Sequence, residues 1–93
     1  MAEQNLHKLE RILKALANER RLSMVQFVRD SRAGEVSVGD IAEHIKLSFK
    51  STSRHLALLE KADIFERRQE SLYVYYRLHS SLPKVAKQII DSL

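Results

Sequence analysis

The sequence predicts a small, mainly α-helical domain with one β-hairpin, in the order α-α-α-α-β-β-α. Two observations support this prediction. Apolar residues recur at helical spacings of three and four along most of the 93 residues, and the period changes to two only once, over residues 64–78. The length is that of one small domain, so we expect a single domain over residues 1–93.

Composition limits the classes of function that are open. The chain has no cysteine, which excludes disulfides, zinc ribbons and thiolate metal sites. No apolar run approaches the roughly 18 residues of a membrane span, and the first residues lack the apolar core of a secretion signal. We therefore expect a cytoplasmic protein without a membrane partner. The net charge of +4 is modest evidence for a polyanionic partner.

The first two helices are expected over residues 3–17 and from Glu19 to about residue 32. The first carries a strict apolar seam at alternating spacings of three and four, made by Leu6, Leu9, Leu13 and Leu16. Such a seam is typical of a helix that packs along another helix, possibly from a second chain. A plain amphipathic core helix is the alternative. Asn18 is the expected N-cap of the second helix.

Residues 37–62 read as two short helices joined by a tight turn. Ser37 can cap the first helix, and Lys46 and Leu47 interrupt its apolar pattern. Ser48 offers a second N-cap oxygen before a helix whose inner side has Thr52, Leu56 and Leu59. We expect the Thr52 hydroxyl to bond the preceding turn. The pattern is that of a helix-turn-helix.

The outer side of the second helix favours contact with nucleic acid. Lys50 and Arg54 lie there beside Ser53 and Phe49. An Arg can bond guanine with two hydrogen bonds, and Ser or Lys can reach base edges or phosphate. Phe49 could contact a thymine methyl or simply cover the turn, and an ordinary solvated face is the alternative for the whole helix. The candidate DNA-binding residues of this helix are Ser48, Phe49, Lys50, Ser51, Ser53, Arg54 and His55.

The change of period to two predicts a β-hairpin over residues 64–78. Alternation places Leu72, Val74, Tyr76 and Leu78 on the inner side of the second strand. Residues 64–68 are the expected partner strand and residues 69–71 the expected tip. Arg67 and Arg68, near that tip, would form a second basic surface that contacts the DNA backbone.

The last helix is expected over residues 81–92, with Ser80 or Ser81 as its cap and Pro83 in its first turn. Its apolar stripe is broad for a terminal helix, and an exposed apolar face of that size normally finds a partner. We therefore expect a symmetric homodimer joined through both terminal helices. The alternative is that the two helices pack only on each other. The candidate interface residues are Leu6, Leu9, Leu13, Leu82, Val85, Ile89 and Leu93.

Four stretches together resemble the winged helix-turn-helix regulators of the ArsR type, over nearly the whole chain. They are LKALANERRL (residues 13–22), VGDIAEHIKLS (38–48), STSRHLALLEKADI (51–64) and VYYRL (74–78). The resemblance implies a homodimer that places two recognition helices in successive major grooves of an imperfect palindrome in double-stranded DNA. It also implies a repressor of transcription that an effector releases.

The chain departs from that family pattern at its sensor positions. The cysteine metal site is replaced by EVSVGD (residues 35–40), and His79 and Asp91 lack the paired ligands of a second family site. No two of the four histidines stand at the usual ligand spacing. We therefore expect no metal and no cofactor, and the effector stays unknown.

The chain also departs from the family pattern at its turns. Lys46 and Asp63 stand where Gly is usual, and the hairpin tip also lacks Gly, so these turns are expected to be strained or shifted.

Neither composition nor spacing supports an enzyme. A nucleophile needs a positioned base and an oxyanion site, and the sequence shows no such set. The sequence leaves one other function open, a winged-helix module that binds proteins and has only generic affinity for DNA.

Overall fold

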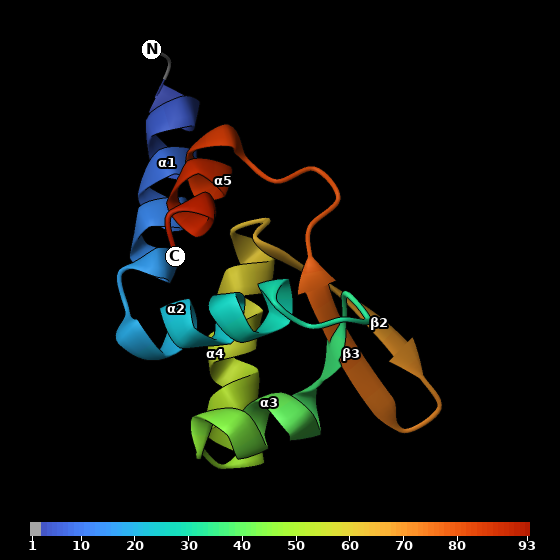
Figure 1. Cartoon of the computed structure of the whole chain (residues 1–93). Helices are drawn as coiled ribbons and strands as arrows, with labels where there is room; N and C mark the ends of the chain where they lie inside the picture. The colour runs from blue at the N-terminus through green and yellow to red at the C-terminus, as the bar shows by residue number, and fades with distance from the viewer. Residues whose placement is uncertain (1–2) are drawn as a thin grey trace.

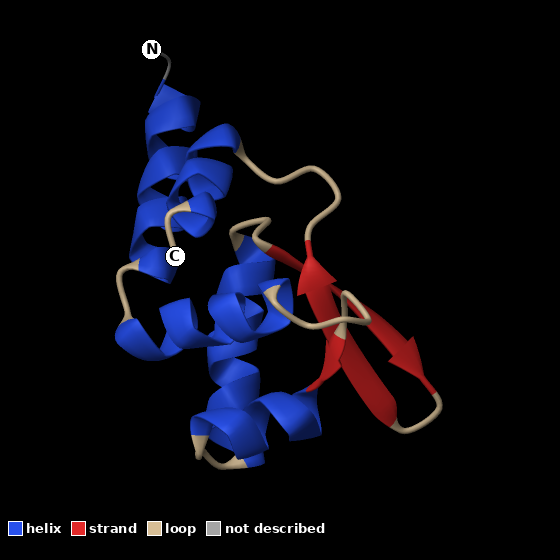
Figure 2. Cartoon of the chain, viewed as in Figure 1, coloured by secondary structure: helices blue, strands red, loops and turns tan. Residues whose placement is uncertain are grey.

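The computed structural model describes residues 3–93. In this part of the chain five helices surround one end of a three-stranded antiparallel sheet (Figures 1 and 2). The elements are α1 (Glu3–Leu16), α2 (Glu19–Arg29), β1 (Val36–Ser37), α3 (Val38–Ile45), α4 (Phe49–Lys61), β2 (Phe65–Glu70), β3 (Tyr73–Leu78) and α5 (Lys84–Asp91). The fold is the expected winged helix-turn-helix, with one short strand added before the helix-turn-helix. None of these helices is both long and apolar enough to cross a membrane.

The terminal helices and the helix-turn-helix lie toward opposite ends of the molecule. Figure 1 shows α1 and α5 together at one end of the molecule, while α3, the start of α4 and the tip of the β2–β3 hairpin lie toward the other. The recognition helix and the wing are therefore presented on one side, away from the chain termini.

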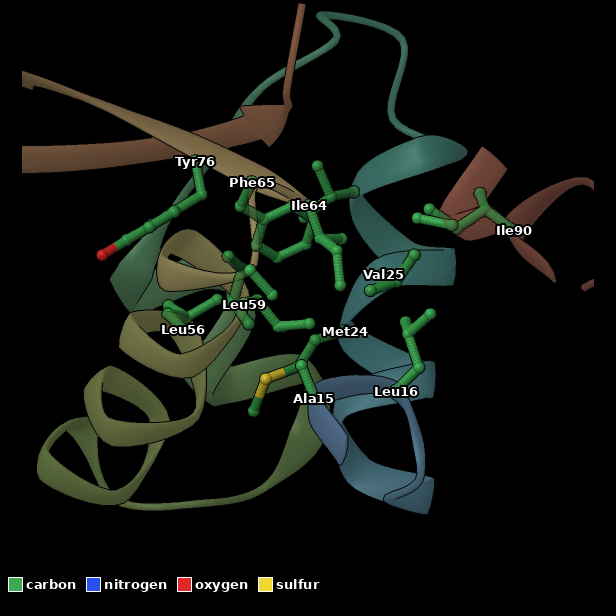
Figure 3. Packing of buried hydrophobic residues seen from close by; sticks show 14 of the residues in the cluster. Ala15, Leu16, Met24, Val25, Leu56, Leu59, Ile64, Phe65, Tyr76 and Ile90 are labelled. Atoms are coloured by element: carbon green, nitrogen blue, oxygen red, sulfur yellow. The ribbon is translucent and has the colours of Figure 1, made fainter. Parts of the chain in front are cut away.

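One apolar core joins these parts (Figure 3). Met24 and Val25 of α2, and Leu56 and Leu59 of α4, are fully buried, as is Phe65 at the start of β2. Ala15 and Leu16 of α1 and Ile90 of α5 extend the cluster to the terminal helices. Because α4 contributes to the centre of this core, its outer side is held in a fixed direction.

Three of the expected N-caps are confirmed. The side-chain oxygens of Asn18, Ser37 and Ser48 each accept a hydrogen bond of 3.1 Å from the backbone N–H three residues later. Each bond satisfies a helix donor that would otherwise have no partner. The starts of α2, α3 and α4 are thus determined locally.

The ends of two helices differ from expectation. Helix α5 begins at Lys84 rather than residue 81, and Pro83 is its N-cap residue without a side-chain cap. Neither serine therefore caps the helix, and the backbone N–H groups of Ser80 and Ser81 donate to Glu66 and to His79 Nδ1. Helix α2 ends at Arg29, not near residue 32, because the chain turns at Asp30 and continues as a loop.

The hairpin lies where it was predicted, over residues 65–78, but its tip is shorter and displaced. The strands run to Glu70 and from Tyr73, so the tip is Ser71 and Leu72 rather than residues 69–71. Leu72 is 93% exposed, and its predicted inward position is wrong because it lies in the turn. Arg67 and Arg68 lie in the middle of β2, opposite Tyr76 and Tyr75.

Three turns without glycine adopt left-handed backbone. The φ angles of Lys46, Asp63 and Ser71 are 60°, 58° and 56°, a region that costs residues with a Cβ about 1–2 kcal/mol. The strain expected at Lys46, Asp63 and the tip is therefore present in the backbone itself. The buried hydroxyl of Thr52 has no hydrogen-bond partner in residues 3–93, so the predicted bond to the preceding turn is wrong.

Candidate nucleic-acid interface

The first two turns of α4 present an exposed polar face. Lys50 and Arg54 are exposed, and neither has a carboxylate within ion-pair distance in the described chain. Phe49 is 61% exposed beside them. An unpaired Lys and Arg one turn apart on a rigid helix can reach phosphate oxygens or base edges of a duplex without first breaking a protein contact.

The serines of this face contribute less free surface. Ser48 is exposed, but its Oγ already accepts the Ser51 backbone N–H. Ser51 and Ser53 are half-buried on the flanks of the helix. All three hydroxyls keep an O–H that can donate to an acceptor on DNA.

His55 contacts α2 and does not belong to this exposed face. Its Nδ1 lies 3.0 Å from Nη1 of Arg21. Burial lowers the pKa of the imidazole, and the positive charges of Arg21 and Arg20 lower it further. Since Arg can only donate, His55 is neutral and accepts through Nδ1. The histidine thus connects the recognition helix to the helix before it.

The two arginines of the wing have different surroundings. Arg67 is exposed, donates a long hydrogen bond of 3.3 Å to the amide oxygen of Gln69, and has no carboxylate within ion-pair distance among residues 3–93. Arg68 donates to Glu35 Oε2 (3.1 Å) and Glu70 Oε2 (2.8 Å), and its guanidinium lies 4.7 Å from the centre of the Tyr75 ring. The Arg68 hydrogen bond lowers the pKa of Glu35. Two carboxylates thus compensate the charge of Arg68, while that of Arg67 is uncompensated.

The residues considered for metal binding lie apart. Within residues 3–93 no three His, Asp or Glu side chains are grouped closely enough to hold a metal ion. His79 precedes α5 and lies 3.9 Å from Asp63, and Asp91 pairs with Lys87 at 2.7 Å. His44 stacks on Phe27, with ring centres 3.9 Å apart. These residues have structural contacts instead of a shared site.

Sequence reasoning did not single out Arg21 and Glu35. Arg21 Nε donates to the Ala15 carbonyl (2.6 Å) and Nη2 to the Lys14 carbonyl (3.2 Å), so it binds the end of α1 as well as His55. The helix dipole disfavours a cation in the first turn of α2. This unfavourable position was the one sequence signal that Arg21 has a specific contact. Glu35 stands in a loop, and nothing in the local pattern indicated its partner on β2.

Comparison with known proteins agrees with this geometry. The family model described as "Bacterial regulatory protein, arsR family" matches residues 18–66. The transcriptional activator HlyU of Vibrio cholerae is 35% identical over 98% of this chain and 82% of its own length. The arsenical resistance operon repressor of Escherichia coli is 38% identical over 86% of this chain and 67% of its own length.

Solved structures give the same result. The structure of HlyU from Vibrio cholerae has a TM-score of 0.79 at 35% identity and covers 98% of this chain and 92% of its own. The homodimeric winged helix-turn-helix DNA-binding domain of Mb0332 from Mycobacterium bovis has a TM-score of 0.79 at 25% identity, covering 99% of this chain and 82% of its own. This chain therefore belongs to the ArsR family of bacterial regulatory proteins and is a transcriptional regulator with a DNA-binding winged helix-turn-helix, not an enzyme.

Proposed function

We propose that this regulator is a homodimeric repressor that binds an imperfect palindrome in double-stranded DNA through α4, in the cytoplasm, without a cysteine metal site. One observation carries the proposal: Lys50 and Arg54 are exposed and unpaired on the outer side of a helix whose inner side is fixed in the core. Recognition helices of this motif enter the major groove with their N-terminal residues. Arg54 then reads a base edge and Lys50 contacts phosphate or a base.

The neighbouring residues of α4 complete the reading surface. Ser48, Ser51 and Ser53 donate their hydroxyl protons to phosphate or base acceptors, and Phe49 contacts a thymine methyl. His55 acts indirectly, because its ring accepts from Arg21 and orients α4 against α2. In the wing, Arg67 contacts the DNA backbone, whereas Arg68 holds β2 to the loop that carries Glu35.

The dimer is supported by apolar side chains that the protomer leaves uncovered. Leu6 and Leu13 of α1 remain 54% and 44% exposed although α5 lies beside α1 (Figure 1). Packing of the two terminal helices on each other therefore leaves Leu6 and Leu13 uncovered. A second copy would cover them together with the partly buried residues Leu9, Leu82, Val85, Ile89 and Leu93. The homodimeric state of the Mb0332 domain supports a homodimer here as well.

The DNA part of the proposal is tested by fluorescence anisotropy on a labelled duplex at fixed salt. We expect Lys50→Ala with Arg54→Ala to weaken binding by at least about tenfold, since each dimer loses four direct contacts. Lys8→Ala with Lys84→Ala removes equal charge from exposed positions of α1 and α5 and is the matched control. Equal losses in the two variants would show that only overall charge matters, as in a module with generic DNA affinity.

The dimer is tested by sedimentation of Leu9→Lys. A lysine in the apolar seam would be desolvated without a partner, so we expect monomers at concentrations where the parent is dimeric. Leu72→Lys, the same change at the exposed hairpin tip, is the control and should remain dimeric. A dimeric Leu9→Lys would place the interface elsewhere.

A further inference from the structure

A basic hollow between α1 and the end of α4 has no part in the proposed DNA contact. Its volume is about 450 Å³. Arg11 and Lys14 from α1, Arg21 from α2 and Lys61 from α4 all line it, and Glu10 is its one acidic residue. Glu10 forms a long ion pair of 3.9 Å with Lys14 in which both side chains are largely exposed. Such a pair contributes little, so the hollow keeps a surplus of positive charge.

Three helices thus direct like charges into one concave space. Neither Arg11 nor Lys61 has a carboxylate within ion-pair distance in residues 3–93. Cations that converge in a concavity raise the local potential and attract an anion. A bound anion would also relieve their mutual repulsion.

The floor of the hollow is apolar. Ala15 is buried there, and Leu58 of α4, which also lines the hollow, is 46% exposed. A second hollow of about 340 Å³ shares His7, Arg11 and Lys61 with the first and continues along α1. Each volume falls in the range of small-molecule sites, about 300–1,000 Å³, in which an apolar lining carries a few polar groups.

The hollow is distinct from the other two proposed surfaces. It lies at the C-terminal end of α4, opposite to the end that would enter the groove (Figure 1). The apolar groove along Leu6, Leu9 and Leu13 borders the hollow and shares Glu10 and Lys14 with it, but Arg11, Leu58 and Lys61 do not line that groove. DNA contact and dimerisation therefore leave Arg11, Leu58 and Lys61 unassigned.

From this combination we propose that the hollow binds a small amphipathic organic anion: a carboxylate or phosphate monoester head held by Arg11, Lys61 and Arg21, with a hydrocarbon body over Leu58. Arg21 uses one N–H from each of its three nitrogens on the Ala15 and Lys14 carbonyls and His55. Its two remaining N–H groups can donate to the anion. Since His55 belongs to α4, the ligand site and the recognition helix share one bridging residue.

Calorimetric titration of the full chain without DNA tests the site, so its outcome is independent of the proposed function. The probes are octanoate and octyl phosphate, which distinguish the two heads, with 1-octanol and inorganic phosphate as probes of the body and the charge alone. We expect at least one amphipathic anion to bind at least about tenfold more tightly than either partial probe. Failure of both to bind at millimolar concentration would overturn the proposal, as would equal affinity for 1-octanol.

Two double variants locate the binding. Arg11→Ala with Lys61→Ala should weaken anion binding by at least about tenfold, while Lys50→Ala with Arg54→Ala removes the same charge from the other end of α4 and should leave it within about twofold. All four side chains are exposed, and circular dichroism checks that the variants fold. Amide NMR shifts should concentrate at Ala15 and Leu58. Equal weakening in both variants, or shifts confined to Leu6 and Leu13, would overturn the assignment.

Discussion

The unequal surroundings of the wing arginines predict unequal effects on the salt dependence of DNA binding. Arg67→Ala removes an uncompensated charge, whereas Arg68→Ala removes one that Glu35 and Glu70 already compensate. Only charges that replace counterions at phosphates contribute to the slope of log affinity against log salt concentration. Arg67→Ala should therefore reduce this slope, whereas Arg68→Ala, one residue along, should leave it nearly unchanged.

The magnitude follows from the unpaired cations that can contact phosphate. Arg54 is assigned to a base edge, so each protomer presents two of them, Lys50 and Arg67. At about 0.9 per contact, a dimer that uses both on phosphate gives a slope of about −3.6. Loss of Arg67 from both protomers brings it to about −1.8. Loss of Arg68 leaves the slope near its parent value and lowers affinity uniformly, because Glu35 then faces the DNA uncompensated.

Anisotropy titrations of one duplex at four or five salt concentrations measure these slopes. The parent protein, Arg67→Ala and Arg68→Ala are compared on the same DNA, and circular dichroism confirms that each variant is folded. An Arg68→Ala slope reduced as much as that of Arg67→Ala would refute the reasoning, since it would mean that Arg68 leaves its carboxylates to bind phosphate. An unchanged slope for Arg67→Ala would remove the wing from the interface.

Three further predictions concern single residues. Arg54→Ala should cost about 1–3 kcal/mol of DNA binding and relax preference at one position of each half-site; equal loss on every sequence in competition assays would show a phosphate contact instead. Lys46→Gly should raise the free energy of unfolding in urea by up to about 1 kcal/mol, because glycine adopts the left-handed backbone of this turn without strain. A lower free energy of unfolding would show that Lys46 is not strained there. The pKa of His55 in the folded protein is lowered from 6.5, so the unfolded chain takes up the proton first and stability should fall as pH drops below about 6.5. Arg21→Ala should raise the pKa of His55 in an NMR titration, and an unchanged value would show that burial alone lowers it.

The features predicted correctly are those that neighbouring residues determine. The caps at Asn18, Ser37 and Ser48 each depend on a bond to the third residue along the chain. The inner faces of α3 and α4 follow from helical periodicity, which needs no knowledge of the partner. The left-handed turns at Lys46 and Asp63 were expected from the family resemblance, because Gly is usual at both positions.

The features that were missed depend on contacts between distant residues. Strand β1 has two residues and exists only because it pairs with β3. The Arg68–Glu35 and Arg21–His55 contacts join residues 33 and 34 positions apart. The start of α5 was misplaced because Glu66 of β2 binds the backbone of Ser80. A local pattern contains no information on such partners. Only the fold therefore shows which arginine has carboxylates beside it and which has none.

The most direct test of the account is selection of the purified protein against a randomised pool of duplex DNA at near-physiological salt, followed by sequencing. The account predicts enrichment of an inverted repeat whose half-sites lie about one helical turn apart, as two α4 helices of a symmetric dimer require. Recovery of no motif, with weak binding that salt abolishes, would contradict sequence-specific recognition by α4.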